Sequence, residues 1–340
     1  MKKILSIDGG GIRGIIAGQI LVALEEKLQQ KSGNPNARIA HYFDFFAGTS
    51  TGGILTCIYL CPDEKDPFKP KFSAKEAVSL YIKNGRKIFD TDIFQEIKSG
   101  NGIIDEKFNA ANLEDCLKSY FGEIKLSELL KPCIITSYDI EQRQTKFFAQ
   151  HDYQRRGQGG DYLVRDVCRA TSAAPTYFET AQVKSLSGVN YALTDGGVFA
   201  NNPALCAYSE VRNSKGQPTA KDMFIVSIGT GSENKPYSYD DAKNWGAIGW
   251  IRPIIDIMMS GASETTHYHL TKMFSAQGNQ DNYLRIQPTD IRKAKFDMDD
   301  ATDENIIALI EAGTKTAEDC SELDQIVEKL INDKDSVAFE

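Results

Sequence analysis

A chain of 340 residues is long enough for one large α/β domain or two ordinary ones. Its net charge of −8 and the lack of a basic cluster in the sequence argue against a nucleic-acid-binding protein, and the charge also argues against bulk attraction to anionic membranes. Strand and helix patterns alternate without an evident linker, so the sequence predicts a single domain over residues 1–340.

The seven cysteines are an odd number and are scattered mostly within apolar runs, which indicates reduced core residues rather than a disulfide framework. Cys57 and Cys61 have helical spacing but no second pair, so the pattern does not favour a zinc site. The apolar runs are too short for a signal peptide or a membrane-spanning helix. We therefore expect a soluble, cytoplasmic protein that needs no metal and no other cofactor.

The first predicted elements are a short apolar strand over residues 3–8 and an amphipathic helix over residues 15–30. The loop between them begins with three glycines, Gly9, Gly10 and Gly11. Consecutive glycines leave backbone N–H groups uncovered by side chains, so an anion can approach them closely. Such a loop fits either phosphate binding or stabilisation of a developing oxyanion.

The same loop matches a dinucleotide-binding fingerprint, with glycines at positions 9, 11 and 14. That fingerprint needs an acidic residue about 20 positions later, at the end of a second strand. Here those positions fall between Ser32 and Asn36, where no strand is predicted. A phosphate-binding loop of the Walker type would need lysine after Gly14, and the sequence has Ile15 there. Dinucleotide binding stays open as the alternative with less support.

The second motif is Gly-Thr-Ser-Thr-Gly at residues 48–52, directly after an aromatic-rich run at 41–47 that predicts a buried strand. A serine between two glycines at a strand end predicts a tight turn from which the Ser50 hydroxyl projects. The helix expected over residues 51–61 would direct its free amides and positive dipole end at the same place. This pattern is typical of an activated serine nucleophile, although the pentapeptide alone is a weak signal.

The third motif is Asp195-Gly196-Gly197, which follows a short apolar run. Two glycines after the aspartate imply a sharp turn that exposes the carboxylate. Pro203 is well placed to open the next helix. Taken alone, the motif favours a surface turn with a solvated aspartate.

In this order and with this spacing, the three motifs resemble those of the patatin-like phospholipases. The matching segments are Asp8 to Gly14, Gly48 to Gly53 and Asp195 to Gly197. Three further segments of this chain also resemble segments of the family: Phe43-Asp44, Arg169 to Phe178 and Ile225 to Gly231. The resemblance covers roughly residues 3–311, and a C-terminal helical tail is expected over 314–340.

The resemblance implies a three-layer α/β/α sandwich around a mainly parallel sheet. Predicted strands at 3–8, 41–47, 132–139, 222–228 and 283–286 fit that fold, with helices between them. Asp195 would then lie at a turn close in space to Ser50, which the sequence alone does not establish.

The resemblance also implies a Ser-Asp dyad, with Ser50 as nucleophile and Asp195 as the base that acts on it directly. The amides of Gly9, Gly10 and Gly11 would hold the oxyanion. A free aspartate, with a pKa of about 3.9, is a weak base near neutral pH, so Asp195 must lie within hydrogen-bond reach of the serine. The expected route runs through an acyl-enzyme on Ser50, which water then hydrolyses.

Two questions about the site stay open in the sequence. The chain order Ser50, Asp195, His267 also fits a conventional triad, although His267 lies in a polar predicted helix without a loop or glycine nearby. Arg13 is expected either to contact a lipid phosphate or to hold the glycine loop. Asp8 and Asp44 are expected to brace neighbouring turns by hydrogen bonds, without a catalytic role.

Two further segments have more than one interpretation. Residues 245–259 are apolar enough to touch a membrane, but a core helix or a lid over the site is favoured. The acidic run at 297–300 hints at calcium, yet the residues that follow do not fit a calcium-binding loop. It is expected to cap a helix over 303–312, and hydrolysis is expected to be calcium-independent.

The sequence thus predicts a lipid acyl hydrolase of the phospholipase A or lysophospholipase type. Its expected substrate is a membrane phospholipid or another acyl lipid, which it would reach by transient contact with a membrane surface. No nucleic-acid partner is expected, and a homo-oligomer is compatible with the sequence. Two alternatives remain. One is a carboxylesterase or acyltransferase on soluble esters, and the other is a phospholipase effector that a partner or signal must open.

Overall fold

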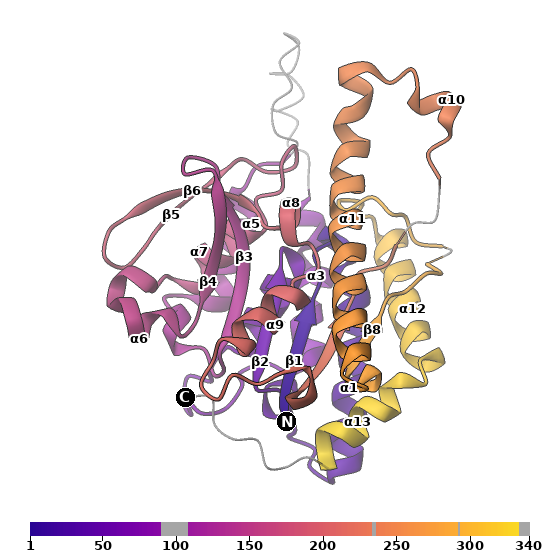
Figure 1. Cartoon of the computed structure of the whole chain (residues 1–340). Helices are drawn as coiled ribbons and strands as arrows, with labels where there is room; N and C mark the ends of the chain where they lie inside the picture. Colours follow the sequence, from indigo (N-terminus) through magenta and orange to yellow (C-terminus); the bar gives the residue numbers. More distant parts are fainter. Residues whose placement is uncertain (90–107, 233–235, 292, 333–340) are drawn as a thin grey trace.

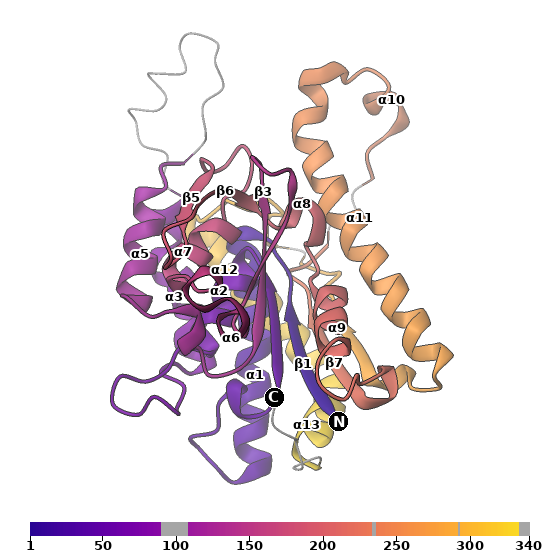
Figure 2. The ribbon, with the colours of Figure 1, turned by 60° about the vertical axis from the view of Figure 1, so that its left-hand side comes forward.

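The computed structural model describes residues 1–89, 108–232, 236–291 and 293–332 (Figure 1). A central sheet lies between two layers of helices, and Figure 2 shows helices on both sides of it. The predicted α/β/α sandwich with a mainly parallel sheet is therefore confirmed.

Parallel strands form the middle of the sheet, in the order β3-β2-β1-β7-β8. They are β1 (Lys2–Ile7), β2 (Phe45–Thr49), β3 (Cys133–Asp139), β7 (Met223–Ile228) and β8 (Tyr283–Ile286). All five predicted strands are present, and only the second has clearly different bounds.

The second strand begins and ends later than the aromatic run predicts. His41 ends a short 3-10 turn, in which its ring nitrogen Nδ1 accepts a hydrogen bond from the Arg38 N–H at 3.1 Å. At the other end, Thr49 pairs with Thr136 of β3, so the ladder continues through Gly48. Pairing with both neighbours therefore extends the strand up to the serine.

Antiparallel strands extend the sheet on one side, and the sequence did not predict them. They are β4 (Gln144–Ala149), β5 (Ala181–Lys184) and β6 (Asn190–Asp195). β6 pairs with the end of β3, and this register sets Asp195 opposite Ser137. Asp195 thus belongs to the sheet, at the end of a strand.

The helices cover both faces of the sheet because its strands are apolar on both sides. Leu5 and Ile7 of β1 face one layer, and Ile4 faces the other. The first layer contains α1 (Gly14–Ser32), α2 (Thr51–Tyr59), α3 (Ala74–Ile88), α5 (Ala111–Phe121), α7 (Val164–Thr171), α12 (Asp303–Asp319) and α13 (Glu322–Asn332). The second contains α9 (Ala204–Arg212) and α11 (Gly246–Ala276), with the short α8 (Gly197–Ala200) beside them. Two more short helices, α6 (Asp152–Arg156) and α10 (Tyr239–Ala242), lie at the periphery (Figure 1).

The C-terminal helices belong to the main core, which extends beyond the expected limit at residue 311. α12 and α13 pack against α1, and Leu323 and Leu330 are buried. The Lys3 ammonium also donates to the Leu330 carbonyl at 3.1 Å. Residues 333–340 of the expected tail lie outside the described residues.

α11 is longer and less covered than expected. The two helical segments that the sequence suggested, 245–259 and 263–274, form one helix. Its C-terminal half packs on the sheet through the buried side chains Leu270 and Phe274. Its N-terminal half projects beyond the body of the molecule (Figure 1), so the expectation of a core helix there is wrong.

Candidate active site

Ser50 lies on the tight turn between β2 and α2 that its flanking glycines predict. Its φ of 55° and ψ of −124° are a conformation that non-glycine residues rarely adopt, which is typical of a nucleophile turn. A Cβ atom on Gly52 would lie 2.2 Å from the Ile7 carbonyl oxygen, so the close approach to β1 requires glycine there. The Ser50 N–H donates to the Thr171 hydroxyl at 2.9 Å, which fixes the strained backbone from α7.

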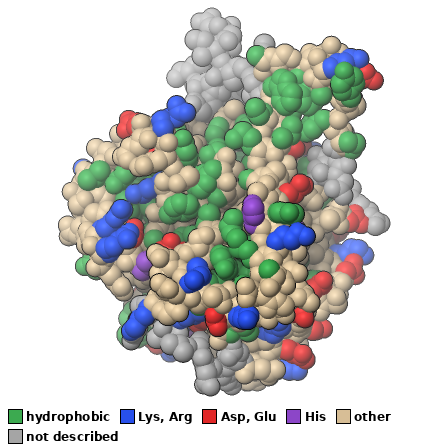
Figure 3. Space-filling model, viewed as in Figure 1, with side chains coloured by type: hydrophobic (Ala, Val, Ile, Leu, Met, Phe, Trp, Pro, Cys, Tyr) green, Lys and Arg blue, Asp and Glu red, His purple; other side chains and the backbone are tan. Residues whose placement is uncertain are grey.

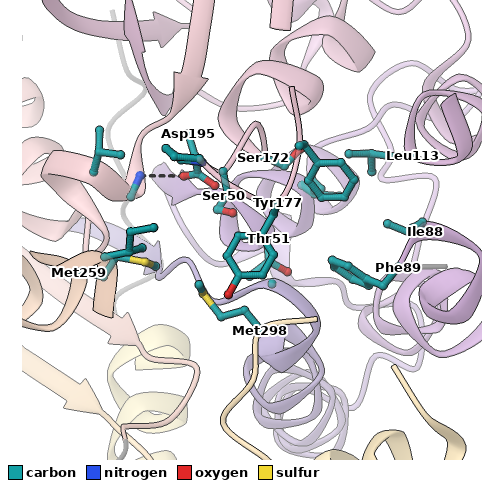
Figure 4. A pocket seen from close by; sticks show the side chains of 18 of the residues that line it. Ser50, Thr51, Ile88, Phe89, Leu113, Ser172, Tyr177, Asp195, Met259 and Met298 are labelled. Carbon is teal, nitrogen blue, oxygen red and sulfur yellow. Dashed lines mark hydrogen bonds between the residues drawn. The ribbon is translucent and has the colours of Figure 1, made fainter. Parts of the chain in front are cut away.

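Asp195 meets Ser50 at this point, although the two are far apart in sequence (Figure 4). The Asp195 carboxylate lies beside the Ser50 side chain and accepts a hydrogen bond from the Gly197 N–H at 2.7 Å. A Cβ atom on Gly196 would lie 2.1 Å from the Thr136 hydroxyl, so the Asp-Gly-Gly turn lies tightly against β3. β3 pairs with both β2 and β6, and therefore brings the two motifs together.

Burial changes the acid-base properties of Asp195. Its side chain is only 4% exposed, and loss of solvent raises the pKa of its carboxyl to about 7, against the opposing effects of the Ser50 side chain and the Gly197 N–H. A carboxylate with this pKa can take up and return a proton near neutral pH. Asp195 is therefore a stronger base near neutral pH than an ordinary, solvent-exposed aspartate.

The glycine loop lies beside Ser50, but its three amides are not equivalent. A Cβ atom on Gly9 would lie 3.2 Å from the Ser50 Cβ, which shows how close the loop is. The Gly9 N–H donates to the Asn201 carbonyl at 3.1 Å, so this amide is already engaged within the fold. Within the described residues, neither the Gly10 nor the Gly11 N–H has a hydrogen-bond acceptor. Of the three amides that were expected to hold the oxyanion, only those of Gly10 and Gly11 are therefore without an acceptor in the described residues.

Met298, in the segment between β8 and α12, holds the other side of the glycine loop. Its carbonyl accepts a hydrogen bond from the Ile12 N–H at 2.8 Å. Gly11 has a φ of 59°, and a Cβ atom there would lie 2.1 Å from the same carbonyl oxygen. The acidic run that hinted at calcium is thus part of the wall of the site. Nearby, Asp300 accepts hydrogen bonds from Thr302, which caps α12 at its start.

The strand before the glycine loop ends in a buried ion pair. Arg285 of β8 donates to both carboxylate oxygens of Asp8, at 2.8 and 2.5 Å. Burial raises the pKa of the Asp8 carboxyl, although Arg285 opposes the shift. Asp8 therefore braces the turn, as expected, and Asp44 likewise accepts the Lys3 N–H at 2.8 Å.

Arg13 points into the protein rather than into the space beside Ser50. Its guanidinium donates to the Gly231 carbonyl at 3.3 Å and to the Gly10 carbonyl at 3.4 Å, and it lies 5.9 Å from the centre of the Phe296 ring. These contacts support the loop-holding role of the two that the sequence left open.

The four histidines occur elsewhere. The His267 ring hydrogen-bonds to the Tyr283 hydroxyl at 3.2 Å, and His151 pairs with Glu210 at 2.8 Å. None of the four lines the cavity at Ser50. The structure therefore does not support a histidine-containing triad.

A narrow apolar cavity begins at Ser50 and Asp195 and runs between helices (Figure 4). Its volume is about 90 Å³, by a measure in which one water needs roughly 10–15 Å³. Side chains from several elements line it, including Ile88, Phe89, Leu113, Phe178, Met259 and Met298. This lining suits a hydrocarbon chain and offers few partners to a polar substrate.

The sequence model of a family described as patatin-like phospholipase matches residues 5–208, which is more than half of the chain. The chain belongs to this family. Patatin-like protein 1 of Arabidopsis thaliana is 37% identical, over 93% of this chain and 81% of that protein. The resemblance on which the motifs were interpreted is thus confirmed, and the dinucleotide alternative has no support.

The relatives of this chain also include a protein whose name describes it as inactive. A protein of Solanum tuberosum named probable inactive patatin-3-Kuras 1 is 32% identical, over 92% of this chain and 85% of its own. Among solved structures, a human GIVD cytosolic phospholipase A2 complex covers 97% of this chain at 11% identity, with a TM-score of 0.45. This chain spans 58% of that one.

Several residues of the site gave no usable signal in the sequence. Arg285 and Met298 stand in ordinary polar or mixed contexts, and only the sheet order brings them to the glycine loop. Thr171 lies within a segment that resembles the family, and Asn201 follows the Asp195 turn, but their contacts depend on the fold. Among the helices that the structure describes, none is long and apolar enough to cross a membrane.

Proposed function

We propose that this protein is a lipid acyl hydrolase of the phospholipase A or lysophospholipase type, with Ser50 as nucleophile and Asp195 as general base. The observation that carries the proposal is the buried Asp195 carboxylate, which lies beside the Ser50 side chain and has a pKa raised to about 7. Family membership supports general lipid hydrolysis, and the apolar cavity beside Ser50 supports an acyl substrate.

In the proposed reaction, the Ser50 oxygen attacks the ester carbonyl carbon while its proton passes to Asp195. Negative charge develops on the carbonyl oxygen, where the Gly10 and Gly11 amides would donate hydrogen bonds. Each such donor is typically worth about 100- to 1,000-fold in rate. Asp195 then returns the proton to the departing alcohol, and an acyl ester remains on Ser50.

Hydrolysis repeats these steps with water as the nucleophile. Asp195 takes a proton from a water molecule as the oxygen of that water attacks the carbonyl carbon of the acyl-serine. The fatty acid leaves, and Ser50 recovers its proton. We propose that no metal ion takes part, because backbone amides and one carboxylate supply each proton and charge contact.

The test is fatty-acid release from mixed phospholipid vesicles in the presence of a chelator, by the wild type and by Ser50→Ala. We expect release by the wild type and none by the variant. Release that survives in Ser50→Ala contradicts the assignment of the nucleophile. Activity that vanishes with chelator and returns with calcium contradicts the metal-free mechanism.

A short soluble ester, assayed in parallel, separates the alternatives. Hydrolysis of that ester without release from vesicles favours a carboxylesterase on soluble substrates. Transfer of the acyl group to an added alcohol favours an acyltransferase. Silence of the wild type on both substrates contradicts constitutive hydrolysis and favours a phospholipase that a partner or signal must open.

A further inference from the structure

The projecting half of α11 exposes more apolar surface than a solvent-facing helix needs. Trp250, Ile254, Ile257 and Met258 are 41 to 47% exposed. Their spacing of four, three and one residues places them on one side of the helix. We call these four residues the α11 stripe. Large apolar side chains gathered in this way usually mark a binding surface.

The α11 stripe continues directly into the cavity at Ser50. Ile255, Met258 and Met259 of the same helix line that cavity, and Met258 belongs to both surfaces. An apolar molecule on the stripe can therefore enter the cavity past Met258 without crossing water. This continuity points to an occupant that contains the substrate itself.

Aromatic residues lie at the projecting end of the helix. The Trp245 ring stacks edge-to-face on Tyr237 at 5.1 Å and on Trp250 at 4.9 Å. Tyr239, on α10, is 81% exposed. Tryptophan and tyrosine are the side chains that favour the interface between lipid and water, because they are apolar with one polar group.

The apolar surface also extends from α11 toward the sheet. α8, which follows the Asp195 turn, packs against α11, and its Phe199 stacks on Phe147 of β4 at 5.8 Å. Phe147 is 38% exposed. Figure 3 shows hydrophobic side chains gathered at the projecting end and across the face below it.

Charge indicates which kind of lipid surface fits. Residues 236–261 contain three aspartates, one lysine and one arginine, which gives a net charge of −1. The whole chain carries −8. An anionic membrane would repel such a surface weakly, whereas burial of apolar side chains in a zwitterionic one needs no charge.

We propose that the α11 stripe docks on a zwitterionic phospholipid surface, from which an acyl chain enters the cavity past Met258. This proposal rests on the proposed function, because it concerns the route by which that site receives its substrate. Docking here would bring the mouth of the cavity against the bilayer and leave the sheet and the C-terminal half of α11 in water.

The test compares Ile254→Glu/Ile257→Glu with a matched control on the same helix, Thr265→Glu/Thr271→Glu. All four positions are exposed, so neither variant disturbs the core, and both add the same charge. Binding to phosphatidylcholine vesicles is measured by sedimentation in a Ser50→Ala background, in which the lipid should stay intact. Hydrolysis of vesicles and of a short soluble ester is measured with Ser50 present.

We expect the stripe variant to lose at least about tenfold in vesicle affinity and in vesicle hydrolysis, while its soluble-ester hydrolysis stays within about twofold of wild type. The control should match wild type in all three assays. Affinity of the wild type should change little between low and high salt, because the contact is apolar.

Several results would overturn the proposal. If the stripe variant and the wild type bind vesicles equally well, the stripe does not form the contact. If the wild type does not bind vesicles, the proposed docking is contradicted. A wild-type dimer that the stripe variant converts to a monomer, with vesicle binding unchanged, assigns the stripe to a second copy of the chain. If the wild type binds vesicles through the stripe but hydrolyses no ester, the proposed function is contradicted while the docking proposal stands.

Discussion

The site contains two regions that the chain builds in different ways. The polar region, formed by Ser50, Asp195, Gly10 and Gly11, is held by backbone and side-chain hydrogen bonds at the ends of strands. The apolar region, the cavity, is formed mainly by apolar side chains from helices and from the segments between them. Hydrogen bonds fix positions to fractions of an ångström, as the chemistry needs, while packing tolerates changes of similar volume. Changes in the polar region should therefore affect catalysis, and changes in the cavity should affect the choice of substrate.

Removal of the nucleophile should have the largest effect. Ser50→Ala should lower kcat/KM by at least about 1,000-fold on every ester, because no other group can form the acyl-enzyme. The matched control is Ser172→Ala. Ser172 also lines the cavity, but its hydroxyl donates to the Cys168 carbonyl at 2.5 Å. Steady-state kinetics on one ester gives kcat/KM for both variants. An equal loss of kcat/KM in Ser172→Ala would contradict the specific role of Ser50.

The buried carboxylate should reduce stability at high pH. The pKa of Asp195 is about 7 in the folded protein, above its ordinary value of 3.8, so the folded state holds this proton more tightly than the unfolded state. The stability that this proton contributes is complete below about pH 4 and is lost as the pH rises to about 7. Asp195→Asn should therefore increase the free energy of unfolding at pH 8 by up to about 4 kcal/mol, and by little near pH 4.

Urea unfolding of Asp195→Asn and wild type at pH 4, 6 and 8 measures this difference. A difference that does not vary with pH would show that Asp195 has an ordinary pKa in the folded protein. The variant should also be inactive, so a gain in stability would accompany a loss of function.

The same pKa should appear in the kinetics. Because the base must be ionised, kcat/KM should fall about tenfold per pH unit below pH 6, and about 50-fold between pH 7 and pH 5. A soluble ester is the right substrate, since lipid packing does not then vary with pH. A midpoint near pH 4 would mean that Asp195 is not buried during turnover, or is not the base.

The glycine loop offers a test of smaller size. Gly11→Ala places a Cβ atom against the Met298 carbonyl and should move the amides that hold the oxyanion, with a loss of about 10- to 100-fold in kcat/KM. Gly33→Ala is the control, because Gly33 also has positive φ but no atom lies within 4 Å of its Cβ position. That variant should lose about 1 kcal/mol of stability and no activity. Comparable activity losses in both would indicate a general effect of backbone strain.

Substitutions in the cavity should have the smallest effect on the chemistry. Leu113 is 3% exposed and lines the cavity away from the polar region (Figure 4). Leu113→Trp should lower kcat/KM about tenfold for long acyl chains and leave short esters within about threefold. Leu113→Met, which conserves volume, should change neither. An equal loss on short and long esters would show that the cavity does not hold the acyl chain.

The sequence by itself determined the local features of this protein. Glycines around Ser50 and after Asp195 mark tight turns, and this signal is readable over a few residues, although several atoms that exclude a side chain there belong to β1 and β3. Apolar runs likewise located the five parallel strands, since all but β8 at the edge of the sheet are buried on both faces. The second strand shifted because pairing with its neighbours, rather than its composition, set its ends.

Only the tertiary structure decided what depends on contacts between distant segments. Sheet order and register bring Asp195 to Ser50 through β3 and Arg285 to Asp8 through β8, and no local pattern encodes either distance. The fold also engages the Gly9 amide with Asn201 and leaves the α11 stripe uncovered. The physical reason is that a turn is a property of adjacent residues, whereas burial and hydrogen bonding depend on what the rest of the chain places beside them.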